Sequence, residues 1–174
     1  RGLFAPLLAP LVGACSPLAL LNAVGPRDRG AGRVGRDLAY GDDPRQRMDV
    51  HAPTPGAAAQ SLPVLVFFYG GGWDSGARRL YGWAAQALAA QGFLVFTPDY
   101  RLVPQVHFPA FIEDAAAATA RAADLAAAYG GDVGRLGVIG HSAGAYLAMM
   151  IALDRRYMAA VERPDVIRAA AGLA

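Results

Sequence analysis

The stretch LGVIGHSAGAYLAMM, residues 136 to 150, joins a short apolar run to a longer apolar segment through two glycines and a serine. The run LGVIG predicts a strand buried on both faces, and residues 142 to 153 predict a helix. Between them, GHSAG has the pattern G-x-S-x-G. A turn this tight strains the serine, and glycines on either side leave room for neighbouring backbone. The pattern therefore predicts Ser142 as a nucleophile lifted above the sheet; an ordinary glycine-rich turn is the alternative.

A second glycine-rich stretch, YGGGW at residues 69 to 73, follows another apolar run, VLVFFY. Glycine loses the most freedom when it is ordered, so three in a row suggest that backbone must approach another group closely. A serine that attacks an acyl carbon needs backbone N–H donors for the oxyanion that forms. We expect Ala143 to supply one such donor, and Gly71 and Gly72 to supply the others.

Apolar runs and helical segments alternate along the rest of the chain. We expect strands at 47–53, 64–69, 93–98, 136–140 and 167–173, a short extended piece at 35–40, and helices at 80–91, 108–129 and 142–153. Strands that alternate with helices predict βαβ units. The predicted fold class is α/β, with a mostly parallel sheet covered by helices on both faces.

Composition narrows the functional classes. The chain has 174 residues, of which 55% are hydrophobic, and its formal net charge is only +2. This length suggests one domain or part of a larger one. The basic residues form no stripe, so we expect no nucleic-acid partner. A single cysteine excludes an internal disulfide framework. The three histidines share no metal-ligand spacing, so we expect no metal site and no cofactor.

The first fifteen residues, RGLFAPLLAPLVGAC, have the layout of a secretory signal: an arginine, an apolar stretch and small residues before Cys15. The last four, VGAC, resemble a bacterial lipobox. We therefore expect a leader at 1–15, a linker at 16–34 and the folded part at 35–174. Lipidation of Cys15 would attach the protein to a membrane of the bacterial cell envelope. The alternative is an unmodified apolar leader and a cytoplasmic location.

The motifs together resemble those of a known family. YGGGW and GHSAG, with DYRL (99–102) and FPAFIEDAAAA (108–118) between them, are similar to motifs of the α/β-hydrolase superfamily. Within this superfamily, the chain resembles the HGG-motif carboxylesterases, which include hormone-sensitive-lipase-like and arylformamidase-like enzymes. The similarity covers about residues 35 to 174. The resemblance implies an oxyanion hole made by Gly71, Gly72 and Ala143. It also implies a small carboxylic ester as the substrate, with an aryl formamide or a short peptide as the alternative.

Two departures from that family stand out. Tyr69 occupies the place where the family usually has a histidine that shapes the loop. The family's acid and base also follow the nucleophile, whereas no histidine follows His141 in this sequence. We expect this chain to be the N-terminal portion of an enzyme, truncated after about the sixth strand and nearly inactive alone.

Two histidines and two aspartates of this sequence are candidates for the acid and the base. His141 is expected to point away from Ser142, whereas His107 follows the predicted strand at 93–98, on the face where active sites form, and is a candidate base. Asp99 and Asp114 are expected to hold loops or to solvate a helix end. A second hypothesis for the whole chain is a catalytically inactive, membrane-tethered binding domain of the same fold.

Overall fold

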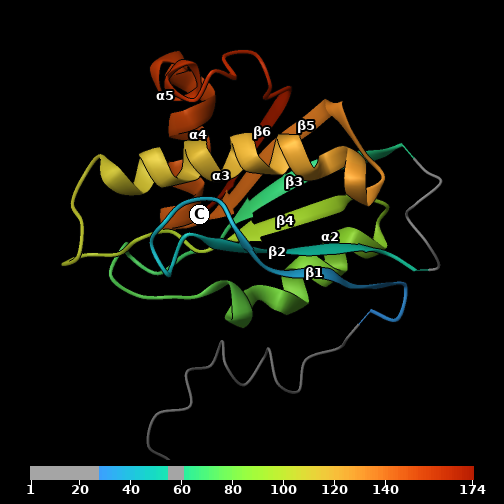
Figure 1. The fold of residues 1–174 in the computed structure, drawn as a ribbon. Coiled ribbons are helices and arrows are strands. Elements are labelled where there is room, and N and C mark those ends of the chain that lie inside the picture. Colours follow the sequence, from blue (N-terminus) through green and yellow to red (C-terminus); the bar gives the residue numbers. More distant parts are fainter. Residues whose placement is uncertain (1–27, 55–60) are drawn as a thin grey trace, which may run out of the picture.

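The computed structural model describes residues 28–54 and 61–174, which form a six-stranded sheet flanked by helices (Figure 1). The strand order is β1-β2-β4-β3-β5-β6. Strands β3 to β6 are mutually parallel, whereas β2 is antiparallel to both β1 and β4. The predicted α/β class and mostly parallel sheet are confirmed. The elements are β1 (Ala31–Ala39), β2 (Arg47–Pro53), β3 (Leu62–Phe68), η2 (Arg78–Tyr81), α2 (Gly82–Ala90), β4 (Leu94–Pro98), α3 (Ala110–Ala126), η3 (Ala127–Tyr129), β5 (Gly131–His141), α4 (Ala143–Leu153), α5 (Arg155–Ala160) and β6 (Ala169–Leu173).

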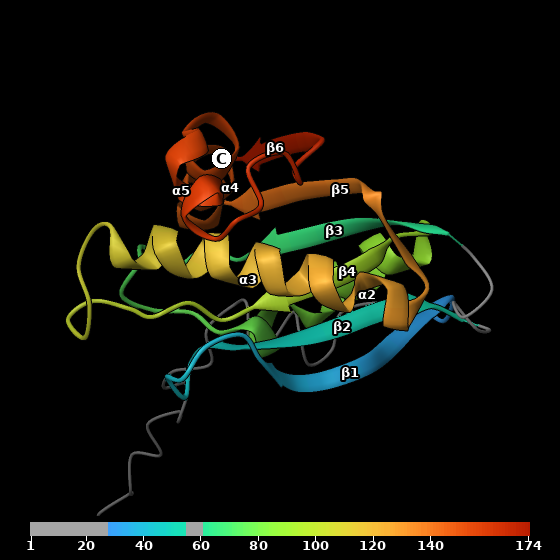
Figure 2. The same ribbon diagram turned by 45° about the horizontal axis from the view of Figure 1, so that its top comes forward.

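Helices cover both faces of this sheet. Figure 2 shows α2 on one side and α3, α4 and α5 on the other. All five residues of β4 are buried, as expected for a strand covered on both faces. The buried face of α3 is mostly alanine, so this helix can pack closely against its neighbours. The parallel strands all end on one side of the molecule, where ligands bind in open α/β sheets.

Strand β1 begins within the range predicted as a linker, so the end of that linker was predicted too late. β1 begins at Ala31, so residues 31–34 belong to the sheet and not to a linker. Most side chains of β1 are exposed, and its pairing with β2 is interrupted on both sides of Gly35. A mostly exposed edge strand does not need alternating apolar residues. The sequence therefore indicated only the part at 35–40 and not the whole strand. The predicted leader at 1–15, with Cys15, and the linker up to residue 27 lie outside the described residues.

Other helices and strands also differ from the predicted ones where their residues are few or exposed and so give no clear apolar pattern. Helix α5 was not predicted, because its six residues are too few to show a periodicity. β5 starts at Gly131, five residues before the predicted strand, and this early part is largely exposed. Gly130, with φ of 78°, ends the α3–η3 segment as predicted. Within the described ranges, no helix has both the length and the apolar character that crossing a membrane requires.

His51 is a buried histidine in β2 and is 8% exposed. In the sheet it lies opposite Arg33 of β1 on one side and Val95 of β4 on the other. Its Nδ1 has no hydrogen-bond partner within the described residues. Burial lowers the pKa of His51 to about 4, and Arg33 acts in the same direction, although Asp49 opposes both. The imidazole is therefore neutral in the folded protein at pH 7.

Neutral burial of His51 predicts a loss of stability in mild acid. An unfolded histidine has a pKa of about 6.5, so between pH 6.5 and 4 the unfolded chain binds a proton that the folded chain does not. We expect His51 to lower the free energy of unfolding by about 2 kcal/mol between pH 7 and pH 5. Denaturant unfolding of the wild type and of His51→Gln at both pH values measures this. Equal pH dependence in the two proteins would contradict it.

Candidate active site

Ser142 occupies the junction between β5 and α4 in a strained backbone conformation, with φ of 53° and ψ of −120°. A non-glycine residue in such a region costs of order 1–3 kcal/mol, and these residues cluster at functional sites. The Ser142 N–H donates to the carbonyl oxygen of Leu173 at 2.7 Å, and the Ser142 carbonyl accepts from the N–H of Tyr146 at 3.2 Å. The serine itself is exposed. The predicted strained turn between strand and helix is confirmed.

The two glycines of GHSAG let α4 begin directly against the sheet. A Cβ on Gly144 would lie 2.1 Å from the carbonyl oxygen of Phe68 and 2.5 Å from that of Tyr69. A Cβ on Gly140 would lie 2.1 Å from the carbonyl oxygen of Gly144. All three contacts are with backbone, which cannot move aside as a side chain could. Gly144 is therefore required by the close approach of α4 to the end of β3, and Gly140 by the tight turn from β5 into α4.

The YGGGW loop lies beside Ser142. A Cβ on Gly70 would be 3.0 Å from the Cβ of Ser142, so these two backbones are in close contact. Gly71 and Gly72 both have positive φ, 151° and 58°, which favours glycine. The Gly71 carbonyl accepts from the backbone N–H and the hydroxyl of Ser75, at 3.0 and 2.8 Å, so the loop folds back on itself. The structure thus brings together the two predicted glycine-rich segments.

The N–H groups predicted to form the oxyanion hole are not used elsewhere in the described part of the chain. Among its hydrogen bonds, none is donated by the N–H of Gly71 or Gly72. Ala143 is the first residue of α4, and an N–H at that position has no acceptor within its own helix. The amino end of α4 also carries the positive end of the helix dipole. This corner can therefore accept negative charge.

Tyr69 is fixed by a partner that the sequence alone did not predict. Its hydroxyl accepts from Arg45 Nη2 at 2.9 Å, and Arg45 also donates to the carbonyl oxygens of Gly76, at 3.1 Å, and Tyr100, at 2.9 Å. The Tyr69 ring stacks between Tyr81 and Tyr100, with centroids 5.7 and 4.7 Å away. Burial raises the pKa of Tyr69 above its usual value, so the phenol stays neutral. Arg45 thereby links both ends of the glycine loop.

The two aspartates singled out in the sequence hold loops, as predicted. Asp114, 1% exposed, accepts from Arg101 N at 2.8 Å and Nη2 at 2.7 Å, and from Gln46 Nε2 at 2.8 Å. Asp99 accepts from the backbone N–H of Arg78 at 2.6 Å and also pairs with its guanidinium. Both carboxylates are therefore committed to arginine partners.

No histidine is hydrogen-bonded to the Ser142 hydroxyl within the described residues. The His141 Nδ1 lies 3.5 Å from the Tyr81 hydroxyl, and a Cβ on Gly70 would be 2.8 Å from it. His141 thus faces Tyr81 and Gly70, while His107 is exposed in the loop before α3. Across residues 28–54 and 61–174, no three histidine, cysteine or acidic side chains are grouped to hold a metal ion.

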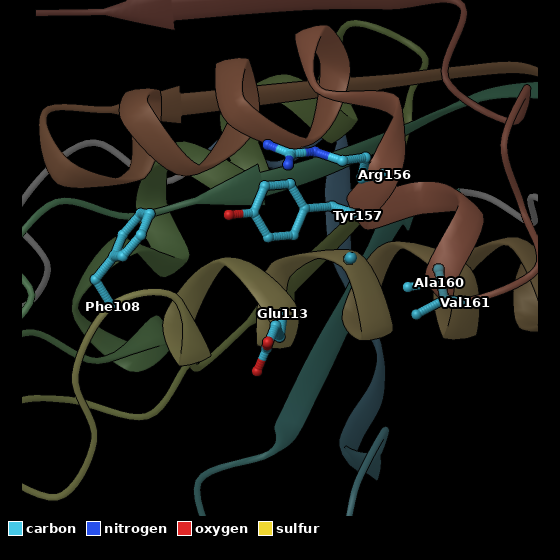
Figure 3. A pocket seen from close by; sticks show the side chains of 7 residues that line it. Phe108, Glu113, Arg156, Tyr157, Ala160 and Val161 are labelled. Atoms are coloured by element: carbon cyan, nitrogen blue, oxygen red, sulfur yellow. The ribbon is translucent and has the colours of Figure 1, made fainter.

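A hollow of about 450 Å³ lies between α3 and α5 (Figure 3). Because α5 was not predicted, no pattern in the sequence indicated this hollow. None of the predicted site residues lines it. Its lining residues are Phe108, Glu113, Ala116, Arg156, Tyr157, Ala160 and Val161.

The chain is similar to known proteins over most of its length. The BD-FAE family model matches residues 48–163. The chain is 39% identical over 119 residues to a probable isoprenylcysteine alpha-carbonyl methylesterase, ICMEL1, of Oryza sativa subsp. japonica, covering 67% of this chain and 27% of that protein. It is also 39% identical over 132 residues to esterase LipC of Mycobacterium tuberculosis, covering 71% of this chain and 32% of that protein.

Solved structures show the same architecture. An inhibited esterase B from Lactobacillus rhamnosis superposes with a TM-score of 0.73 at 25% identity, over 87% of this chain and 49% of that one. EstE1, a carboxylesterase cloned from a metagenomic library, superposes with a TM-score of 0.69 at 27% identity, over 88% of this chain and 49% of that one. The chain thus spans between a quarter and a third of the length of the two sequence relatives and about half of these solved chains.

Proposed function

We propose that this protein hydrolyses carboxylic esters through Ser142. The chain belongs to the BD-FAE family, whose model matches residues 48–163, and the proposal proceeds from this membership. Proteins similar to it are named esterases, and one solved relative is an esterase bound to an inhibitor. The observation that carries the proposal is the strained Ser142 at the head of α4, in close contact with Gly70. An ordinary turn between a strand and a helix requires neither feature.

The reaction would start with attack of the Ser142 Oγ on the ester carbonyl carbon. The new Oγ–C bond turns the carbonyl oxygen into an oxyanion, to which the N–H groups of Gly71, Gly72 and Ala143 would donate. The C–O bond to the alcohol then breaks, and the alcohol leaves with a proton. Water hydrolyses the remaining acyl-enzyme. These steps involve only protein groups, water and the ester.

The proton of the Ser142 hydroxyl must pass to a general base. His51 is buried in β2, His141 faces Tyr81, and His107 is exposed in the loop before α3. None of the three is hydrogen-bonded to the Ser142 hydroxyl within the described residues. We therefore propose that the base and its acid partner are contributed by residues outside this stretch of 174. The greater length of the esterases that resemble this chain supports this proposal.

A fluorophosphonate probe tests the function directly, because it reacts only with an activated serine. The protein at its full natural length is incubated with the probe, digested and analysed by mass spectrometry. We expect the label on the peptide that contains Ser142, and none after heat unfolding. Labelling of Ser61 or Ser75 instead, or of no serine, would count against the proposal.

A further inference from the structure

We infer that the hollow between α3 and α5 binds the hydrocarbon chain of the ester substrate, so that esters of longer chain are preferred. This inference rests on the function proposed above and adds a substrate class to it. It depends on three features: the lining of the hollow, a row of aromatic rings that leads to it, and the position at which that row begins.

The walls of the hollow are apolar. They are formed by aromatic, valine and alanine side chains from the loop before α3, from α3 and from the segment of α5. Figure 3 shows the Tyr157 ring extending from α5 across the hollow towards Phe108, with the Glu113 carboxylate pointing away. The other charged lining residue, Arg156, is largely exposed and pairs with Asp154 at 2.6 Å. The charges therefore stay at the rim, and the volume of about 450 Å³ is typical of a ligand pocket.

A row of aromatic rings joins this hollow to the proposed catalytic corner. The ring centroids of Phe108 and Phe111 are 6.3 Å apart, those of Phe111 and Trp73 are 5.9 Å apart, and those of Trp73 and Tyr146 are 5.6 Å apart. Trp73 directly follows the three loop glycines. Tyr146 lies about one helical turn after Ser142. The row therefore starts beside both the nucleophile and the loop and ends at the hollow.

Both ends of the row are exposed. Phe108 is 60% exposed and Tyr146 is 41% exposed, although both are large apolar side chains. Phe111, between them, is only 7% exposed, so the surface that the row offers lies at Phe108 and Tyr146. A chain of methylenes lying against these two rings would remove them from water, and each methylene buried contributes about fourfold to affinity. A charged group would find no partner of opposite charge there, because the row carries no charged side chain. A hydrocarbon chain is therefore the occupant that fits.

Filling the hollow tests the inference. Ala160 lines it and is exposed on α5, so Ala160→Trp adds bulk without disturbing the core. Ala159→Trp places the same side chain on the same helix, also exposed but outside the lining, and is the matched control. We expect Ala160→Trp, in the protein at its full natural length, to lower kcat/KM at least tenfold for p-nitrophenyl decanoate and less than twofold for p-nitrophenyl acetate. Ala159→Trp should change neither value more than twofold.

Decyl acetate, compared with ethyl acetate, shows whether the chain on the alcohol side occupies the hollow instead; selective loss in either series supports the inference. An equal loss for short and long esters, or no loss in either series, would overturn it, since the hollow would then be filled by protein or left unused.

Binding of decanoate, measured by calorimetry, keeps the test independent of hydrolysis. Ala160→Trp should weaken that binding at least tenfold, and unchanged binding would refute the inference. Absence of acetate hydrolysis in the wild type would instead count against the proposed function.

Discussion

Replacement of Ser142 by alanine is expected to lower kcat for ester hydrolysis by about 10⁴-fold or more, because the attacking oxygen is lost. Some rate above that of water should remain, since N–H donors beside the carbonyl still stabilise the oxyanion. Stability should change little. Ser142 is exposed, no hydrogen bond of its hydroxyl occurs within the described residues, and alanine fits a φ of 53° no better than serine does. Hydrolysis of p-nitrophenyl acetate by the protein at its full natural length measures the effect.

The matched control for Ser142→Ala is Ser61→Ala. Ser61 is exposed just before β3, at the opposite end of that strand from the glycine loop. Its hydroxyl donates to Asp132 and accepts from Arg135 Nη2, both at 3.3 Å, and all three residues are away from Ser142. This control should keep full activity. A Ser142→Ala variant that retained a tenth of the wild-type rate, with an unchanged melting temperature, would show that another group performs the attack.

The features that the sequence predicted well are those that local backbone geometry demands. Ser142 is strained, and glycines stand at 140 and 144, because α4 begins directly against the backbone at the ends of β3 and β5; the pattern G-x-S-x-G therefore indicates this tight turn from the sequence alone. The glycine run at 70–72 was likewise expected where backbone comes close to another group, and a Cβ on Gly70 would lie 3.0 Å from the Cβ of Ser142. Buried strands such as β4 were found because burial on both faces demands an unbroken apolar run.

The features that the sequence did not predict depend on contacts between distant segments. Arg45 lies in a polar loop before β2, and nothing near it indicates that its guanidinium reaches the phenol of Tyr69, 24 residues later. The one available signal was Tyr69 itself, a buried phenol that must find a partner for its hydroxyl. The hollow beside α5 arises in the same way, because it needs two helices whose approach is set by the tertiary fold.

Replacement of Gly144 by alanine is expected to lower the free energy of unfolding by about 3 kcal/mol. The added Cβ would lie 2.1 Å from the carbonyl oxygen of Phe68, so α4 or β3 must shift. Helix propensity alone predicts the opposite, because alanine in a helix is more favourable than glycine by about 1 kcal/mol. The sign of the measured change therefore decides between the two effects. Denaturant unfolding gives that sign.

Gly32→Ala serves as the control for Gly144→Ala. The nearest atom to a Cβ on Gly32 would be the Thr54 methyl group at 3.7 Å, an ordinary contact, so stability should change by less than about 0.5 kcal/mol. A Gly144→Ala protein more stable than the wild type would mean that α4 does not begin against the end of β3. Ser142 would then not be held beside Gly70, and the proposed oxyanion hole would lose its geometric basis. The stability of this one variant thus tests the catalytic site without any measurement of catalysis.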